Sequence, residues 1–231
     1  MHNMRKSPGG GQVVNRNRVR IWSPSPDQLD AGMWDAVART LSSAFSSRDW
    51  QNSPMPVGDA SDAHSAVGVM TELRDGPLLV ATRDAADVEV TQVVGCVLGG
   101  VLNESLIDSY RLGNFGARTG DAILAYIGVT PEAQGIRGFP RNNGFLDKIF
   151  SSNDTPRKPD ESDSLAGAMF STWLELPEIA SCPTVFVRTR ETIGSMLHLL
   201  SKHGFEHQGR FDLEFHGSLQ SRLVYRRHNH D

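Results

Sequence analysis

The chain has 231 residues, of which 39% are hydrophobic, so it is long enough to bury a core and to form one large domain. Its formal net charge of −4 and its isoelectric point near 6.1 exclude a bulk electrostatic attraction to nucleic acid or to an anionic membrane. No stretch approaches the roughly 18 to 20 apolar residues of a membrane span, and residues 1–11 lack the apolar middle of a signal peptide. We therefore expect a cytoplasmic protein, with neither nucleic acid nor a membrane as its partner.

The cysteine content excludes a disulfide framework. The sequence has two cysteines, Cys96 inside an apolar run and Cys182 in a loop before another apolar run. Two cysteines so placed match neither a set of disulfides nor a metal-ligand pattern. We expect both thiols to be reduced and packed, and we expect no metal site.

The predicted elements are strands interleaved with helices. Residues 1–17 show no periodicity and are rich in glycine, asparagine and basic residues, which predicts a disordered arm before a single domain over 18–231. Runs of apolar residues predict strands over 18–22, 77–83, 92–102, 122–129, 184–190, 211–215 and 222–227. Helical spacing of apolar residues predicts helices over 27–45, 63–72, 165–176 and 191–203. The short connections between several strands favour a mixed, mostly antiparallel sheet in an α/β (α+β) fold.

Several residues predict where these helices begin and end. Asp27 is the expected N-cap of the first helix, which should end near Phe45. The helix from Leu165 has one apolar face, formed by Leu165, Met169, Trp173 and Leu176. Gly204 follows the last helix at the position where a left-handed C-cap is expected.

The strand over 122–129 leads into a loop suited to binding phosphate. Pro131 ends the strand because proline cannot donate a hydrogen bond to a ladder. Gly135 and Gly138 then allow backbone N–H groups to approach an anion closely, and Arg137 lies between them. The segment therefore indicates a phosphate cradle.

Two segments in this order of elements resemble the GCN5-related N-acetyltransferase (GNAT) superfamily, over about residues 18–227. The family's loop has Val-x-Pro and then Gln or Arg, two residues, Gly, one residue, and Gly or Ala. Here Val129-Thr-Pro-Glu-Ala-Gln-Gly-Ile-Arg-Gly138 matches the Val-x-Pro and the Gln, whereas Arg137 stands where the first Gly is expected. Ser201-Lys-His-Gly-Phe205 looks like the end of the family's closing helix with its Gly-Phe. No subfamily is identified.

The resemblance implies the GNAT-like acyl-CoA N-acyltransferase fold, with helices on both faces of the sheet, and acetyl-CoA or another acyl-CoA as co-substrate. Backbone groups of the central strand would bind the pantetheine arm, at Ile127, Gly128 and Val129. Loop amides would hold the pyrophosphate, at Gln134, Gly135, Ile136, Arg137 and Gly138.

The family's helix begins directly after this loop, whereas here a hydrophilic stretch intervenes. The helix that starts at Leu165 has two small residues in its first turn, Gly167 and Ala168. These would allow the helix end to approach the phosphates. This assignment makes 139–164 an insertion within the binding loop. The alternative is that Gly144–Phe150 is the phosphate-binding helix, and we prefer the first assignment because a seven-residue helix is marginal without packing.

The family's usual proton-transfer groups are missing. Many relatives use a Glu on the central strand, where this chain has Ile123, and Asp121 two residues earlier is the candidate replacement. The family's Tyr on the closing helix corresponds to Leu200. Ser195 and His198, on the same predicted helix, are the candidate substitutes, while packing is the expected role of Tyr126.

The expected function is an N-acyltransferase that moves an acyl group, most simply acetyl, from coenzyme A to an amine of a small molecule or peptide by direct attack. The acceptor pocket is expected from the loops at 49–64, 102–120 and 139–164. The main alternative is a non-catalytic acyl-CoA-binding or interaction module, which the missing Glu and Tyr motivate. A nucleotide-dependent oxidoreductase is disfavoured because no strand–GxGxxG–helix unit occurs. A homodimer remains open.

Overall fold

The computed structural model describes residues 19–25, 28–46, 55–62, 65–84, 91–139, 163–215 and 218–229. Four predictions concern residues outside these ranges: the disordered arm, Asp27 as an N-cap, nearly all of the insertion, and the alternative helix at Gly144–Phe150.

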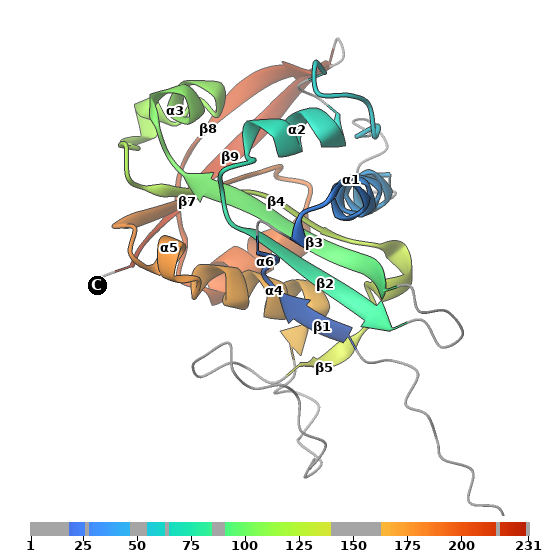
Figure 1. The fold of residues 1–231 in the computed structure, drawn as a ribbon. Helices are drawn as coiled ribbons and strands as arrows, with labels where there is room; N and C mark the ends of the chain where they lie inside the picture. The colour runs from blue at the N-terminus through green and yellow to red at the C-terminus, as the bar shows by residue number, and fades with distance from the viewer. Residues whose placement is uncertain are drawn as a thin grey trace, which may run out of the picture.

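A mixed sheet of seven strands forms the centre of the molecule (Figure 1). In spatial order its strands are β1 Val19–Trp22, β2 Leu78–Asp84, β3 Thr91–Val101, β4 Ala122–Val129, β7 Thr184–Thr189, β9 Ser218–His228 and β8 Glu206–Phe215. Only β4 and β7 run parallel, and every other neighbouring pair in this sheet is antiparallel. The predicted mixed, mostly antiparallel sheet is confirmed.

Helices cover both faces of this sheet (Figure 1). One face, called the α1 face below, carries α1 Ala31–Phe45, α2 Ala66–Glu72 and α3 Glu104–Ser109. The opposite face, called the α4 face, carries α4 Leu165–Leu174, α5 Pro177–Ala180 and α6 Gly194–Lys202. Each face has its own apolar core, because side chains alternate between the two sides of every strand.

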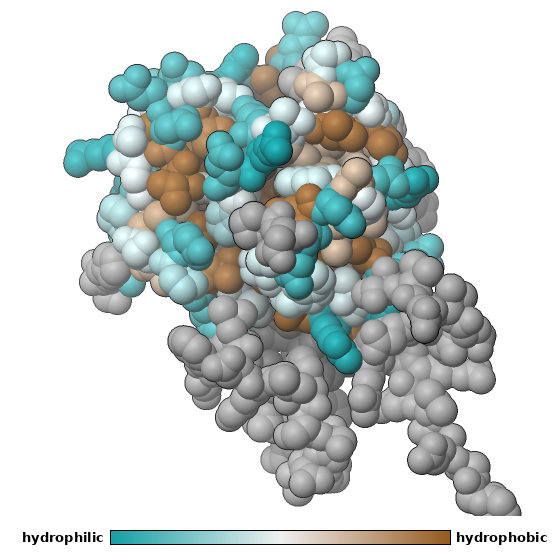
Figure 2. Space-filling model, viewed as in Figure 1, coloured by the Kyte–Doolittle hydropathy of each residue, from teal (hydrophilic) through white to brown (hydrophobic). Residues whose placement is uncertain are grey.

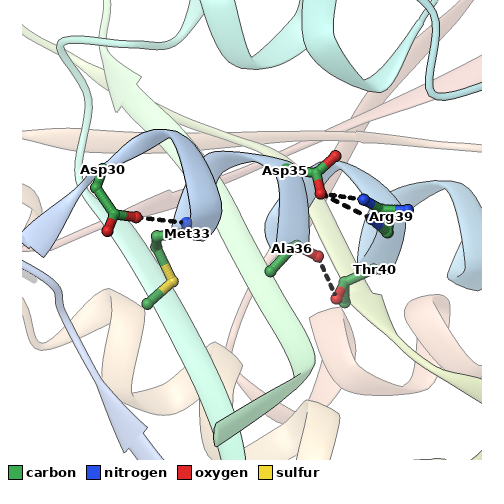
Figure 3. A network of polar contacts seen from close by, with 6 residues as sticks. All are labelled: Asp30, Met33, Asp35, Ala36, Arg39 and Thr40. Carbon is green, nitrogen blue, oxygen red and sulfur yellow. Dashed lines mark hydrogen bonds and ion pairs between the residues drawn. The ribbon is translucent and has the colours of Figure 1, made fainter. Parts of the chain in front are cut away.

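The first helix begins three residues later than expected. Asp30 is its N-cap, and one carboxylate oxygen accepts the backbone N–H of Met33 at 2.8 Å (Figure 3). This bond satisfies a first-turn amide that has no acceptor within the helix. The sequence contains two aspartates three residues apart, and only the contact with Met33 identifies which one caps the helix. The predicted end at Phe45 is confirmed.

The α4 helix lies against two glycines of β3. A Cβ atom at Gly95 would lie 2.8 Å from the Met169 sulfur, and one at Gly99 would lie 2.3 Å from a ring carbon of Trp173. Met169 and Trp173 are fully buried, as the predicted apolar face required. Gly95 and Gly99 are four residues apart on β3, and their contacts Met169 and Trp173 are four residues apart on α4. These two contacts fix the position of α4, and therefore of its N-terminus, relative to β3 and β4.

The remaining differences from prediction lie in connections and at element ends. The segment before β4, expected to be a loop, contains α3, whose N-cap Asn103 accepts the N–H of Leu106 at 2.8 Å. The closing strands β8 and β9 are longer than predicted because they pair along nearly their whole length. Gly204 has a φ of 73° after α6, as the expected left-handed C-cap requires.

The face seen in Figure 1 exposes hydrophilic side chains with apolar surface between them (Figure 2). Within the described ranges, no helix combines the length and the apolar character needed to cross a membrane.

Candidate active site

The parallel strands β4 and β7 separate along their length. Their ladder consists of three pairs, Ala122 with Val185, Ile123 with Phe186 and Leu124 with Val187. Beyond Leu124, β4 continues for five more residues to Val129 and stays paired with β3 alone. Ala125–Val129 therefore has an edge toward β7 that forms no strand ladder, and this gap is called the β4–β7 slot below.

A bulge in β4 coincides with the start of the slot. The pairing with β3 passes from Leu124 opposite Gly99 to Tyr126 opposite Leu98, so that Ala125 is the extra residue. Ala125 and Tyr126 consequently both pack on the α1 face, although neighbouring strand residues normally alternate. A bulge bends its strand and increases the local twist, which explains why β4 leaves β7 here.

The predicted pantetheine residues Ile127, Gly128 and Val129 all lie along the slot. Gly128 has a second role, because an added Cβ atom would lie 3.1 Å from the Cβ of Ala44 in α1. The glycine therefore allows α1 to pack closely against β4 at the slot.

The loop after β4 folds back onto the end of β4. A short 3₁₀ helix, Pro131–Ala133, follows Thr130. The exposed side chain of Gln134 turns back, and its Nε2 donates to the carbonyl of Val129 at 3.3 Å. Gly135 is open, since an added Cβ would meet no atom within 4 Å, and no hydrogen bond is assigned to its N–H within the described ranges.

Ile136 and Leu165, which flank residues 137–164 in sequence, are in direct contact. The N–H of Leu165 donates to the carbonyl of Ile136 at 3.2 Å, and β5 Arg137–Phe139 pairs antiparallel with β6 Asp163–Ser164. Residues on the two sides of the proposed insertion are thus neighbours. The loop after β4 and α4 are adjacent although 28 residues, 137–164, lie between Ile136 and Leu165 in sequence.

This contact permits a second alignment of the loop with the GNAT pattern. If the chain is followed from Ile136 directly to Ser164, the order becomes Gln134-Gly-Ile136-Ser164-Leu-Ala166. The last position then holds Ala166, which the pattern allows, and Ser164 replaces the first Gly. In this alignment Arg137 does not occupy the motif position. It lies exposed in β5, and Gly138 follows it in the same strand.

The N-terminus of α4 lies at this junction. Ser164 is its N-cap, and its hydroxyl accepts the N–H of Gly167 at 3.2 Å. Gly167 and Ala168 are buried in the first turn. Two first-turn N–H groups of α4 therefore have acceptors: that of Leu165 donates to Ile136, and that of Gly167 donates to Ser164. Ala166 lies between them.

A cluster of polar side chains lies on the α1 face beside the slot. Tyr126 packs edge-on against Phe45, with ring centroids 5.9 Å apart, and its phenol interacts with Tyr110. The hydroxyl of Tyr110 in turn donates to the carboxylate of Glu72 at 3.5 Å, and Glu72 is exposed. Tyr126, Tyr110 and Glu72 therefore form a chain of contacts that ends at an exposed carboxylate.

Burial controls the protonation of the two phenols. It raises the pKa of Tyr126 and raises that of Tyr110 well above the ordinary value near 10, where the Glu72 carboxylate adds to the effect. Arg188 acts in the opposite direction on both, but more weakly than burial. Both phenols are therefore neutral at physiological pH and are able to donate a proton.

Arginines complete the cluster. Arg188 of β7 donates to the carbonyl of Tyr110 at 3.2 Å, and its guanidinium lies 4.7 Å from the Tyr110 ring centroid. Arg222 of β9 and Arg190 lie near it, close enough for like charges to act on each other. Desolvation by burial, followed by Arg190 and Arg188, lowers the pKa of Arg222 to about 10. The α1 side of the slot is thus strongly cationic.

The structure places the three predicted proton-transfer candidates away from this cluster. Asp121 is buried at the opposite end of β4, where its carboxylate accepts the N–H of Arg118 at 2.8 Å. Ser195 and His198 are exposed on α6, which covers the α4 face of the sheet. Leu200, at the position of the family's Tyr, is fully buried in the core of that face.

Most residues of the cluster beside the slot have no functional signal in the sequence. The sequence predicts a packing role for Tyr126, places Tyr110 in the expected acceptor loop at 102–120, and predicts only strand positions for Arg188 and Arg222. One signal was available. Arg188 and Arg190 alternate with Val187 and Thr189 near the end of an apolar strand, which predicts two guanidinium groups on one face beside the slot.

No family model matches the sequence, and no curated protein matches it either. Solved structures do match its fold. One is assigned to the GNAT acetyltransferases and comes from Desulfovibrio desulfuricans, with a TM-score of 0.53, 15% identity, and coverage of 92% of this chain and 99% of that one. Another is a ribosomal-protein-alanine N-acetyltransferase from Brucella melitensis, with a TM-score of 0.52, 13% identity, and coverage of 90% and 99%.

A third similar structure is yncA from Salmonella typhimurium, described as an acetyltransferase and solved with its cofactor acetyl-CoA. Its TM-score is 0.50, its identity 12%, and the match covers 93% of this chain and 95% of that one. At these identities the likeness concerns the fold. The chain has the GNAT acyl-CoA N-acyltransferase fold, and the resemblance seen in its sequence is confirmed at that level.

Proposed function

We propose that this protein is an N-acetyltransferase that uses acetyl-CoA and transfers the acetyl group directly to an amine. The observation that carries the proposal is the β4–β7 slot, where the ladder stops after Leu124 while β4 continues to Val129. An extended amide chain such as pantetheine can bind to a strand edge that lacks a neighbouring strand. The GNAT fold and a neighbour solved with acetyl-CoA support the same assignment.

The pyrophosphate would bind where the loop after β4 meets α4. The N–H groups of Gly135 and Ala166 lie at this junction, and the N-terminus of α4 contributes positive potential. Gly135 leaves room for a close approach because no atom lies near the position of its missing side chain. Arg137 is exposed in the neighbouring β5, from which its guanidinium can pair with a phosphate oxygen.

The reaction replaces a carbon–sulfur bond by a carbon–nitrogen bond. The amine nitrogen, after losing a proton to solvent or a base, attacks the thioester carbonyl to form a tetrahedral intermediate. Backbone N–H groups of the open edge of β4 would stabilise the negative oxygen. The carbon–sulfur bond then breaks, the nitrogen loses its second proton, and the thiolate of coenzyme A gains one.

Tyr126 is the candidate donor of that proton. It lies beside the start of the slot, and burial keeps its phenol neutral. Its contact with Tyr110, and that of Tyr110 with the exposed Glu72, offer a route for reprotonation from solvent. In this scheme Tyr126 performs from β4 the role that the family's Tyr performs from the closing helix, where this chain has Leu200.

The rival function is a non-catalytic acyl-CoA-binding module. The observation in its favour is that the usual Glu and Tyr positions hold Ile123 and Leu200, both fully buried and apolar. The two functions share the slot and differ only in turnover.

Release of free thiol from acetyl-CoA tests the proposal. The full chain is incubated with acetyl-CoA and a panel of neutral, acidic and basic amines, and the coenzyme A thiol is measured with a chromogenic reagent. Background from the protein should be small because Cys96 and Cys182 are buried. Amine-dependent thiol release above the no-amine control is expected. Tight binding without turnover on any amine would favour the module, and absence of binding would contradict both functions.

A further inference from the structure

The cationic cluster beside the slot contains more positive charge than the described structure neutralises. Arg188 and Arg222 lie close enough to influence each other, and Glu72 is the carboxylate that acts on Arg188 among the causes resolved within the described ranges. Glu72 is exposed and already accepts hydrogen bonds from Tyr110 and Ser109. The cluster therefore has a net positive charge in a partly desolvated place, which is costly unless an anion binds there.

Arg222 shows most directly that a partner is missing. Its Nη1 atom is buried and has no hydrogen-bond partner within the described ranges. It lies directly opposite Phe211 in the β8–β9 ladder, on the face that also holds Val224 and the α1-face core. A buried guanidinium nitrogen without an acceptor leaves hydrogen-bonding capacity unused, and this cost is removed when an oxyanion binds.

Arg188 is held rigidly next to this position. The carbonyl of Tyr110 accepts from its Nη1, and its guanidinium lies between the rings of Tyr110 and Phe211, at 4.7 and 5.7 Å from their centroids. An aromatic stack of this kind orients the planar fork with little entropy left to lose on binding. A second guanidinium is thus preorganised beside Arg222.

The cluster lies on the acceptor side of the slot. Arg188 is the residue that follows the last β4–β7 pair, Leu124 with Val187, so it flanks the slot at its start. Tyr126 flanks the slot from β4 and acts electrostatically on both Arg188 and Arg222. The phosphate-binding junction at α4 lies on the other face of the sheet. A group bound to these arginines therefore adjoins the acyl end of the slot and not the pyrophosphate end.

We infer that the acceptor amine carries an anionic group, a carboxylate or a phosphate, and that Arg188 and Arg222 bind this group. The inference rests on the proposed function, because it assigns the anion to the acceptor of the acetyl transfer. The anion neutralises the cluster, while the remaining positive charge favours loss of a proton from the substrate's ammonium group. The same charge repels polycationic acceptors such as polyamines and lysine-rich peptides.

Matched pairs of acceptors test the inference. β-Alanine is compared with β-alaninamide, and O-phosphoethanolamine with ethanolamine, while spermidine serves as the cationic probe. The wild-type protein should favour the anionic member of at least one pair by about ten- to a hundredfold in kcat/KM, as expected for hydrogen bonds to a charged group. The pair that shows the preference identifies the anion as a carboxylate or a phosphate.

Two variants locate the effect. Arg222→Gln should remove most of that preference, by about tenfold or more, so that the anionic amines lose much more kcat/KM than their partners without the anionic group. Arg227→Gln is the matched control, since Arg227 lies on the same strand with its guanidinium over Phe205, in the core of the α4 face. Equal kcat/KM for both members of both pairs, or equal losses for all amines in Arg222→Gln, would overturn the inference.

A binding measurement separates this inference from the proposed function. Calorimetric titration of the wild-type protein with O-phosphoethanolamine and with β-alanine, with and without coenzyme A, needs neither turnover nor a folded variant. Ethanolamine and β-alaninamide are titrated in the same way. Heat from one anionic amine and none from its partner without the anionic group would support the anion site even if no acetyl transfer is found. Amine-dependent thiol release without any preference for the anionic amines would support the function and overturn this inference.

Discussion

Tyr126 is the residue whose assignment changed most between sequence and structure. In the sequence it is one aromatic residue in an apolar strand, with packing as its expected role. The bulge at Ala125 places it on the α1 face at the start of the slot, beside Arg188. A bulge depends on how two strands pair, so a single sequence contains no direct signal for it.

Tyr126→Phe tests the proposed proton donor. The substitution should lower kcat by about 10²-fold or more, in the range usual for general acid–base catalysis, and leave acetyl-CoA affinity nearly unchanged. Tyr225→Phe is the control, because Tyr225 packs with His207 on the α4 face of β9. Steady-state kinetics of both variants measure this, and a Tyr126→Phe kcat within twofold of wild type would rule out the assigned role.

The pH dependence of kcat tests the direction of the pKa shift of Tyr126. Because burial raises the pKa of Tyr126 above its ordinary value near 10, the donor stays protonated across the neutral and mildly alkaline range. Wild-type kcat should therefore show no fall from this group below about pH 10. A descending limb near neutral pH that disappears in Tyr126→Phe would show instead that the pKa of Tyr126 is lowered.

At the scale of elements, the position of α4 depends on glycines that carry no catalytic role. A Cβ atom at Gly99 would lie 2.3 Å from both the Ile123 carbonyl oxygen and the Trp173 ring. The carbonyl belongs to the paired backbone of β4 and cannot move aside. Gly99→Ala should therefore cost about 1 to 3 kcal/mol of the free energy of unfolding, or more if β4 shifts.

Gly100→Ala is the adjacent control for this prediction. Its added Cβ atom would meet no atom nearer than 3.8 Å, which is ordinary van der Waals contact. The free energy of unfolding should change by less than about 1 kcal/mol, since alanine only restricts the unfolded chain. Denaturant unfolding of the two variants measures their free energies of unfolding. Equal values would mean that α4 does not pack as closely on β3 as described.

The first helix offers a second test at this scale. Asp30 caps α1, whereas Asp35 forms an exposed pair with Arg39 one turn further on (Figure 3). Asp30→Ala should cost about 1 kcal/mol, and Asp35→Ala about 0.5 kcal/mol or less, because exposed ion pairs contribute little. Thermal unfolding measures both, and an equal or larger loss for Asp35→Ala would show that Asp30 is not the functional cap.

At the scale of the whole molecule, the apolar periodicity of the sequence predicted most of the sheet and the helices α1, α4 and α6. These elements have strong periods of two or near 3.6 residues, which follow from burial on one face. The family resemblance implied that Ile127, Gly128 and Val129 bind pantetheine, and neither the strand separation nor the bulge that accompanies it has a counterpart in the apolar pattern. The contact of Ile136 with Leu165 could not be predicted from the sequence either, because it joins residues on opposite sides of 137–164.

The candidate site was predicted less completely than the fold, for the same physical reason. The strand and loop residues of the slot were found because they follow one another in sequence. Tyr126, Arg188 and Arg222 come from three strands, and Tyr110 comes from a connection, so only the tertiary structure brings them together.

The central claim is that acetyl-CoA binds in the slot between β4 and β7. Hydrogen–deuterium exchange of the full chain, with and without saturating acetyl-CoA, tests it most directly. We predict slower exchange for the backbone amides of 125–136 and of the first turn of α4, with little change in β8 and the paired part of β9. Binding that leaves the 125–136 amides unprotected, or that protects another region instead, would contradict the claim.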